Sequence, residues 1–281
     1  MIELSNTTYQ SWLNQHTFTI PKQTILETPI HLTLSETSAY TFNVEPHSEV
    51  TIIIEFKKAL KDLDEISLVL HVKENSHVKY VLVSEEQTFK TRIDQVIQVD
   101  KNANVHVISS FLSQALEEDL KVNLNGENAR AMVNAIAVSN DTQQQTIDVH
   151  MTHYAPYSYG DMYNVGISNG HGRVTLNGVE KIEKGMKQAN AFQTLKGIIL
   201  SDFSMVDVNP ILLIDEYDVK AGHGATVGKI EEQQLYYLQS RGLTKAEAEK
   251  LIIKGYIKPI LDEMHDQALI ERLEQTIYER I

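Results

Sequence analysis

The sequence of 281 residues contains no cysteine. A disulfide, a thiolate metal ligand and a thiol nucleophile all require cysteine, so none of them can form within this chain. Histidine and carboxylate side chains remain as metal ligands. The composition therefore excludes every mechanism in which this chain itself supplies a thiol.

Positive charge is scarce relative to negative charge. The chain has 25 lysines and arginines against 38 aspartates and glutamates, which gives a formal net charge of −13 at pH 7. Such a surface repels phosphate groups on average, which argues against binding to nucleic acid or to an anionic membrane. A basic protein partner is still compatible with this charge.

Long hydrophobic runs are also missing. A membrane helix needs roughly eighteen uninterrupted apolar residues, whereas the apolar run at residues 50–54 is already broken by Thr51. Residues 1–5 lack the basic region and the long apolar core of a signal peptide. We therefore expect a cytoplasmic protein with no membrane partner.

From Ile25 onward, short segments rich in Val, Ile, Thr and Tyr are separated by polar residues. Most of them alternate apolar and polar side chains, which predicts β-strands. The expected strands are residues 30–34, 40–44, 50–56, 66–72, 78–83, 95–99, 104–111, 120–124, 131–138, 146–151, 162–167, 173–176, 198–200 and 211–214. No clear amphipathic helix interrupts them.

So many short strands favour a sheet that coils, with each turn stacked on the previous one. Asparagine tolerates left-handed backbone geometry, so we expect asparagines at the corners of the coil. The candidates are Asn123, Asn125, Asn128, Asn134, Asn140, Asn164, Asn169 and Asn177. A large two-sheet sandwich or barrel is the rival arrangement, because strand spacing alone does not distinguish them.

Residues 219–228 contain three glycines and His223, a composition that favours tight turns over a packed strand. After this hinge the apolar spacing becomes helical. Thr244 and Glu247 have the capping-box form, Gly255 is expected to stop that helix, and Pro259 to start a short one before a last helix. The predicted organisation is an N-terminal helix or loop segment at 1–24, a β core at 25–220 and a C-terminal helical domain at 221–281.

Several ordered blocks resemble the SufB/SufD family of iron–sulfur cluster assembly proteins. They are residues 122–126, 173–178, 191–201, 209–214, 217–220, 223–228 and 235–242. The glycine after His223 and the sequence Ala-Thr-Val-Gly that follows resemble SufD, since SufB-type chains usually have a glutamate there. SufB-type chains also tend to have a cysteine in the block where this chain has Leu238 and Ser240.

The resemblance implies a mainly β protein, with a right-handed parallel β-helix core and a small C-terminal helical domain. It also implies a SufD-like scaffold subunit of a SUF-type complex, which pairs with a SufB-like subunit and binds a SufC-like ABC-type ATPase. The chain departs from the family in two ways. It is short for SufD, with most of the N-terminal helical domain missing, and it has Ala221 and Gly222 where many relatives have a cysteine.

His223 is the first candidate for a site. The resemblance implies that its imidazole faces the partner subunit and supplies one nitrogen ligand to a transient iron–sulfur cluster at the subunit interface. The chain alone is expected to hold no cofactor. Asp218 is the nearest carboxylate in sequence that would accept the second N–H of the ring. A turn histidine with only a structural hydrogen bond is the alternative.

The helical domain offers a second candidate, a surface for the ATPase. Its expected contact residues are Leu235, Tyr236, Tyr237, Leu251, Ile252, Tyr256 and Ile257. These residues would also serve simply to hold the helices together, and the sequence does not separate the two uses.

The other histidines have weaker sequence signals. Asp148 and His150 share one face of an expected strand while His153 points to the other, so they form no obvious metal pair. His171 lies between two glycines and fits a plain turn.

Two alternatives to the heterocomplex remain from the sequence. A homodimeric scaffold would position the ATPase without metal, because two cysteine-free copies offer no thiolate. A β-helical carbohydrate-active enzyme would use paired acidic residues, and its candidates are Asp202, Asp207, Asp215, Glu216 and Asp218. The sequence shows no nucleotide-binding loop and no persuasive catalytic pair, so we expect a protein that is not an enzyme.

Overall fold

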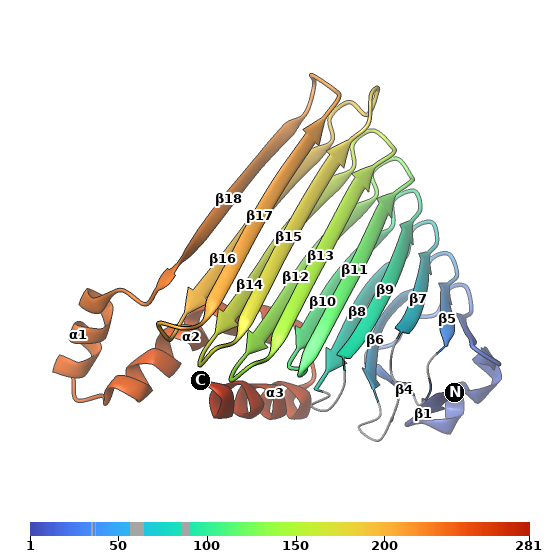
Figure 1. The fold of residues 1–281 in the computed structure, drawn as a ribbon. Helices are drawn as coiled ribbons and strands as arrows, with labels where there is room; N and C mark the ends of the chain where they lie inside the picture. The colour runs from blue at the N-terminus through green and yellow to red at the C-terminus, as the bar shows by residue number, and fades with distance from the viewer. Residues whose placement is uncertain (35, 37, 57–64, 86–89) are drawn as a thin grey trace.

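The computed structural model describes residues 1–281 except 35, 37, 57–64 and 86–89. The chain coils into a parallel β-solenoid with a few helices at its C-terminal end (Figure 1). The predicted mainly β fold and the predicted β-helix are confirmed, and the rival sandwich or barrel is wrong. Parallel pairing of strands that are two apart in sequence decides this.

Two nine-stranded sheets form the walls of the solenoid. The first sheet contains, in spatial order, β1 (Ile2–Leu4), β4 (Ile30–Leu34), β6 (Glu49–Phe56), β8 (His77–Ser84), β10 (Asn104–Phe111), β12 (Arg130–Ser139), β14 (Tyr159–Ser168), β16 (Asn190–Ile199) and β18 (Lys220–Lys229). The second sheet contains β2 (Leu13–Asn14), β3 (Thr17–Ile20), β5 (Ala39–Val44), β7 (Glu65–Val72), β9 (Lys90–Val99), β11 (Ala115–Leu124), β13 (Gln144–His153), β15 (Arg173–Ile182) and β17 (Met205–Ile214).

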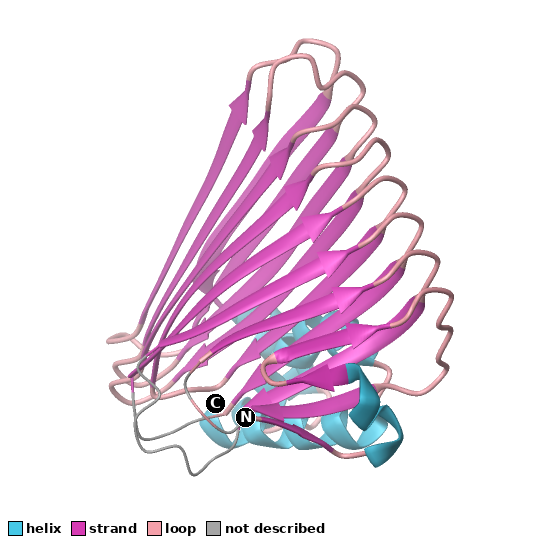
Figure 2. Cartoon of the chain, turned by 90° about the vertical axis from the view of Figure 1, so that its right-hand side faces the viewer, coloured by secondary structure: helices cyan, strands magenta, loops and turns pink. Residues whose placement is uncertain are grey.

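The main core fills the lumen between the two sheets. Alternate residues of each strand point inward, and Tyr40, Phe42, Tyr80 and Phe111 are among the largest that are fully buried. Strands lengthen from five residues in β4 to ten in β18, so the solenoid widens toward its C-terminal end (Figure 2). The turns near the C-terminal end are therefore the longest along the strand direction.

One corner of the solenoid repeats a left-handed residue on each turn. The residues with positive φ along it are Gln23, His47, Asn75, Asn102, Asn128, Tyr157 and Gln188. The backbone N–H of each donates to a carbonyl on the following turn, as from Asn75 to Lys101 at 3.1 Å. Of the asparagines expected at corners, only Asn128 has a positive φ among the described residues. Asn123, Asn134, Asn164 and Asn177 lie inside strands, where pairing overrides their turn preference.

The N-terminal end of the solenoid is closed. The short helix η1 (Thr7–Trp12) lies there, and β1 and β2 pair antiparallel with β4 and β3. The Trp12 ring lies 4.7 Å from Tyr9 and 6.0 Å from Phe18 between centroids, which covers the first turn of the core. The N-terminal segment is thus a cap with its own short strands.

The glycine-rich stretch expected to be a hinge is strand β18, so that expectation is wrong. Residues 220–229 pair in parallel with β16 over their whole length, and this pairing satisfies backbone groups that the composition alone leaves open. The helices begin only at Glu232, eleven residues after the expected boundary at 221.

Three α-helices follow: α1 (Glu232–Ser240), α2 (Lys245–Leu261) and α3 (Gln267–Arg280), with the short helix η2 (Asp262–Met264) before α3. The capping box of Thr244 and Glu247 is confirmed. The expected stop at Gly255 is wrong, because α2 continues through Gly255 and Pro259. Tertiary packing of the buried Ile253, Ile257 and Ile260 outweighs the lost proline N–H.

Helices α2 and α3 pack on the outer face of the first sheet and form a second core with it. Ile257 and Leu273 of the helices join Val81 and Ile136 of the strands in this cluster. Helix α1 has no buried residue and projects away from the solenoid (Figure 1). Helix α1 therefore has no cover from the solenoid, in contrast to α2 and α3.

Candidate functional site

The C-terminal end of the solenoid is open. Strands β17 and β18 are the outer strands of their sheets, so within the part of the chain that the structure describes each has one edge without a pairing strand. Large apolar side chains are exposed on them, including Ile211 at 45%, Leu213 at 47% and Val227 at 45%. Unpaired edges with apolar side chains readily pair with another chain, which makes this end a candidate interface.

His223 lies on β18 at this open end. Its Cα is in register with that of Gln193 on β16, whose side chain is buried in the lumen. The two residues therefore belong to the same inward-facing row, and His223 is the exposed last member of that row. The structure thus places the imidazole at the mouth of the lumen, between the edges of both sheets.

The Asp218 carboxylate does not lie next to the His223 ring. Its carboxylate accepts a hydrogen bond from the side-chain amide of Gln188 at 2.5 Å, and it lies in the turn before β18. Asp218 precedes His223 by five positions, which corresponds to about 16 Å of extended chain. The expectation that Asp218 orients the ring is wrong for this reason. Gln193 is the neighbour that sequence reasoning missed, and only the strand register reveals it.

His150 and His153 lie on the two faces of their strand that the alternating pattern predicted. Asp148 and His150 lie on the outer face of β13, whereas the His153 side chain is fully buried inside. The His171 ring stacks on Phe203 with centroids 5.1 Å apart, at a turn. In the described part of the chain, no three His, Asp or Glu side chains gather where they could hold a metal ion.

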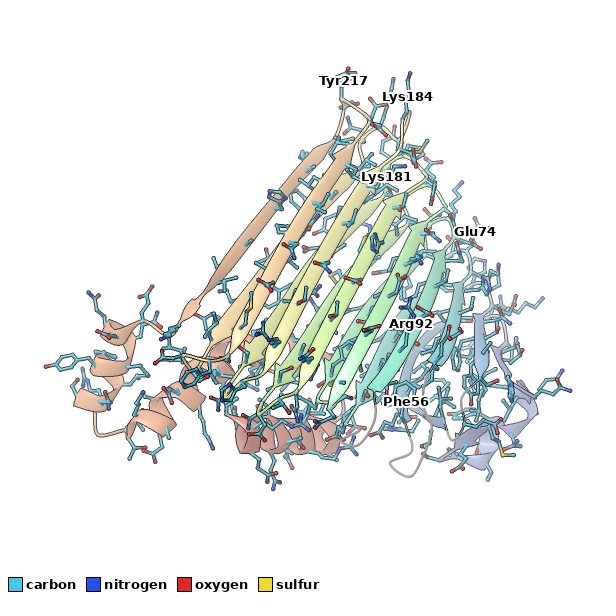
Figure 3. The ribbon with its side chains drawn as sticks, in the orientation of Figure 1. Phe56, Glu74, Arg92, Lys181, Lys184 and Tyr217 are labelled. Carbon is cyan, nitrogen blue, oxygen red and sulfur yellow. The ribbon has the colours of Figure 1, made fainter. Side chains whose placement is uncertain are left out.

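The acidic candidates for carbohydrate chemistry are spread over two corners and the strand between them, with Asp202 at one corner, Asp207 on β17, and Asp215, Glu216 and Asp218 at the other corner. Asp202 follows β16 and forms an ion pair with Lys229. Glu216 lies in the turn beyond β17, where its carboxylate accepts backbone N–H groups of Gly185 and Tyr217. Tyr217 and Lys184 mark this outer tip in Figure 3. Strand β17 separates Asp202 from Glu216 by about 33 Å, whereas glycosidase carboxylates lie within roughly 10 Å of each other, so these two residues do not form a catalytic pair.

The helices form a groove between α1 and α2 with a volume of about 550 Å³. Tyr237, Leu238, Ile252 and Tyr256 are among its lining residues. Tyr236 and Leu251 are exposed elsewhere on the same helices, and Leu235 is half-buried.

Ile257 is the exception among the expected contact residues. It is fully buried in the core between α2 and the first sheet, so its assignment to a partner surface is wrong. The sequence did not indicate that Lys196 of β16 lies 4.2 Å from the centre of the Tyr256 ring. This cation–π contact fixes one wall of the groove against the last turn of the solenoid.

Comparison with known proteins places the chain in a family. The model of the SUF system FeS cluster assembly SufBD core domain matches residues 34–256. The chain belongs to the SufBD core family. The matched region runs from β4 to α2 and includes the open end and most of the groove.

Individual members of the SufBD family show the SufD-like character that the residues indicated. The chain is 29% identical to the iron–sulfur cluster assembly protein SufD of Bacillus subtilis, over 93% of this chain and 63% of that protein. It is 25% identical to SufD of Escherichia coli over 75% of this chain and 51% of that protein. With SufB of Bacillus subtilis it shares 31% identity over 53% of this chain and 32% of that protein.

The chain therefore spans less than two thirds of the length of these curated relatives. Within the described residues, no helix has the length and apolar character needed to cross a membrane.

Proposed function

We propose that the protein is a SufD-like scaffold subunit of a SUF-type iron–sulfur cluster assembly complex, and that it is not itself an enzyme. In this proposal its open end pairs with a SufB-like subunit, and a SufC-like ATPase binds the helices. The single observation that carries the proposal is the contrast between the two ends of the solenoid. One end is closed by η1, β1 and β2, while the other exposes His223 and, among the described residues, one unpaired edge each of β17 and β18.

The position of His223 supports a role at the interface. A partner strand that pairs with β18 would enclose the imidazole in the joined lumen, where one nitrogen would serve as a cluster ligand. The cluster is cargo in this proposal, and thiolate ligands would come from the partner because this chain has no cysteine.

The groove between α1 and α2 supports binding of the ATPase. It combines the exposed Tyr237 with half-buried apolar and aromatic side chains, which is the composition of a protein-binding surface. ATP hydrolysis would then act on α1 and α2, and Lys196 of β16 connects Tyr256 of α2 to the strand next to His223.

Co-expression with the SufB-like and SufC-like proteins of its own source tests the proposal. We expect a stable complex by light scattering, and we expect the His223→Ala variant to form the same complex with less iron and sulfide. His171→Ala is the matched control, because His171 lies in a turn next to Phe203. Unchanged iron and sulfide in His223→Ala would remove the ligand role, and a chain that purifies alone would remove the scaffold role.

A homodimeric scaffold that binds the ATPase without metal is the second candidate. The unpaired edges of β17 and β18 favour it, since two copies of this chain present the same edges to each other. The same light-scattering measurement separates a dimer of this chain from a heterocomplex.

A further inference from the structure

Three donor atoms of different chemistry converge inside the lumen, beside Gly160 of β14. A Cβ built on Gly160 would lie 2.5 Å from Sδ of Met151, 2.9 Å from Nε2 of His153 and 2.9 Å from Oε2 of Glu180. The side chains of His153 and Glu180 are both fully buried, and Met151 is buried as well. A Cβ at this position would overlap all three atoms, so only glycine lets them form a cradle directly against the backbone of β14.

We propose that Met151, His153 and Glu180 form a buried binding site for one divalent first-row transition-metal ion. The site is separate from His223 and does not depend on the proposed assembly role. Imidazole suits zinc, copper, iron and nickel, a thioether adds a soft donor, and the carboxylate neutralises one of the two positive charges.

The distance between the two harder donors fits a shared ion. Nε2 of His153 and Oε2 of Glu180 are 3.2 Å apart. Two ligands that each lie about 2.0–2.2 Å from one ion, at tetrahedral to octahedral angles, are roughly 2.8–3.6 Å from each other. The pair therefore accepts an ion with little movement.

A second observation points to a ligand at the same place. Oε1 of Glu180 is buried and has no hydrogen-bond partner among the described residues. A buried carboxylate oxygen without a partner is costly, and bidentate coordination of an ion would use it. Oε2 of Glu180 thus lies beside His153, and Oε1 is left to complete the coordination of the ion.

The hydrogen bonds of His153 fix its ring in the form that a metal requires. The Ser158 hydroxyl donates to the carbonyl oxygen of Ala155 at 2.7 Å, so its oxygen accepts the Nδ1–H of His153 at 2.8 Å. Nε2 then carries the lone pair and faces Glu180. Metal-binding histidines are held in the same way through their other nitrogen.

The cradle lies close to the open end. Glu180 is in register with Leu212 on β17, the last strand of its sheet, and Gly160 is in register with Ala191, which is followed by Ala221 on β18. The residues stacked between Gly160 and the open end on the first sheet are thus both small. An ion enters most directly from this side.

Expression of the full chain in cobalt-supplemented medium tests the site. All purification buffers contain EDTA, so that only slowly exchanging ions remain, and metal content is measured together with the visible d–d absorption of Co²⁺. We expect about one transition-metal ion per folded chain. We expect Glu180→Gln to lose it, and Met151→Leu to shift the absorption and to lose Co²⁺ to EDTA at least tenfold faster.

Two variants serve as controls. Met162→Leu changes another buried methionine of the same lumen, one that lies beside Gly178 rather than Gly160, and it should retain the ion as the wild type does. His223→Ala should also retain it. Less than a tenth of an ion per folded wild-type chain would overturn the proposal. The proposal would also be overturned if Met151→Leu behaved as the wild type, or if His223→Ala lost the ion. Both of these results can be interpreted even if Glu180→Gln fails to fold.

Discussion

At the scale of single residues, the lumen holds a second buried carboxyl group, on Glu118 of β11. Tyr80 donates to Oε1 of Gln95 at 2.9 Å, and the Gln95 amide donates to Oε1 of Glu118. Burial raises the pKa of Glu118 to about 8, with the negative charges of Asp148 and Asp119 adding to the effect. The group is therefore protonated in the folded protein at neutral pH.

This carboxyl group makes stability fall as pH rises. Below its unfolded-state pKa, near 4.5, Glu118 is protonated in both states, but between there and about 8 only the folded state keeps the proton. The folded state binds more protons in this window, so the free energy of unfolding decreases, by on the order of 5 kcal/mol in total.

We expect Glu118→Gln to remove most of this pH dependence, because the amide has nearly the same shape and does not ionise. Denaturant unfolding between pH 5 and pH 8 measures it. Glu117→Gln is the control, since Glu117 lies on the outer face and is 42% exposed. Equal slopes in Glu118→Gln and in the wild type would show that Glu118 is ionised in the folded state.

At the scale of elements, the sequence predicts strands well but not what covers them. The first half of β12 alternates buried and half-buried residues, whereas its second half is buried throughout. Continuous burial means that both faces are covered, and Ile136 and Val138 contact the helices there. The apolar run at 135–138 carried this signal. No local pattern, however, indicates that α2 and α3 are what packs on it.

Dependence on distant partners also explains why the predicted hinge at β18 and the predicted helix stop within α2 were wrong. Glycine-rich residues 220–229 have low strand propensity, and Gly255 and Pro259 have low helix propensity, yet pairing with β16 and packing on the first sheet decide both structures. His223 was identified from the residues around it. Its neighbour Gln193 and the cradle of His153 and Glu180 depend on register between strands that are distant in sequence.

Two substitutions in the helices separate structural from binding residues. We expect Ile257→Ala to lower the free energy of unfolding by roughly 2–5 kcal/mol, because it leaves a cavity in the second core. We expect Tyr236→Ala to change stability by less than about 0.5 kcal/mol, because that side chain is 76% exposed. Thermal unfolding and capture of the ATPase on immobilised protein measure the two effects. Loss of capture without loss of stability in Ile257→Ala would return Ile257 to the binding surface.

At the scale of the whole molecule, the two ends of the solenoid differ. Resemblance to the family indicated the β-helix, but the sequence alone did not show that residues 1–20 close one end. That closure depends on antiparallel pairing of β1 with β4 and of β2 with β3, which short polar segments do not reveal. Because one end is capped and the other is open among the described residues, each chain has a single site for association by edge pairing. Association through this site joins two chains and no more.

Because only the C-terminal end is open in the described part of the chain, we expect added charge at that end to weaken association and added charge at the capped end to have no effect. Lysine at Leu213 of β17 and at Val227 of β18 would place two charges on the exposed edges of the open end, and charged side chains oppose edge pairing. We expect the double variant to elute as a monomer under conditions where the wild type pairs with itself or with a SufB-like subunit. Its melting temperature should change little, since both side chains are nearly half exposed. Glu3→Lys places a charge on β1 at the capped end and should leave the mass measured by light scattering unchanged. If Glu3→Lys dissociates the assembly and the double variant does not, the chain associates through its N-terminal end.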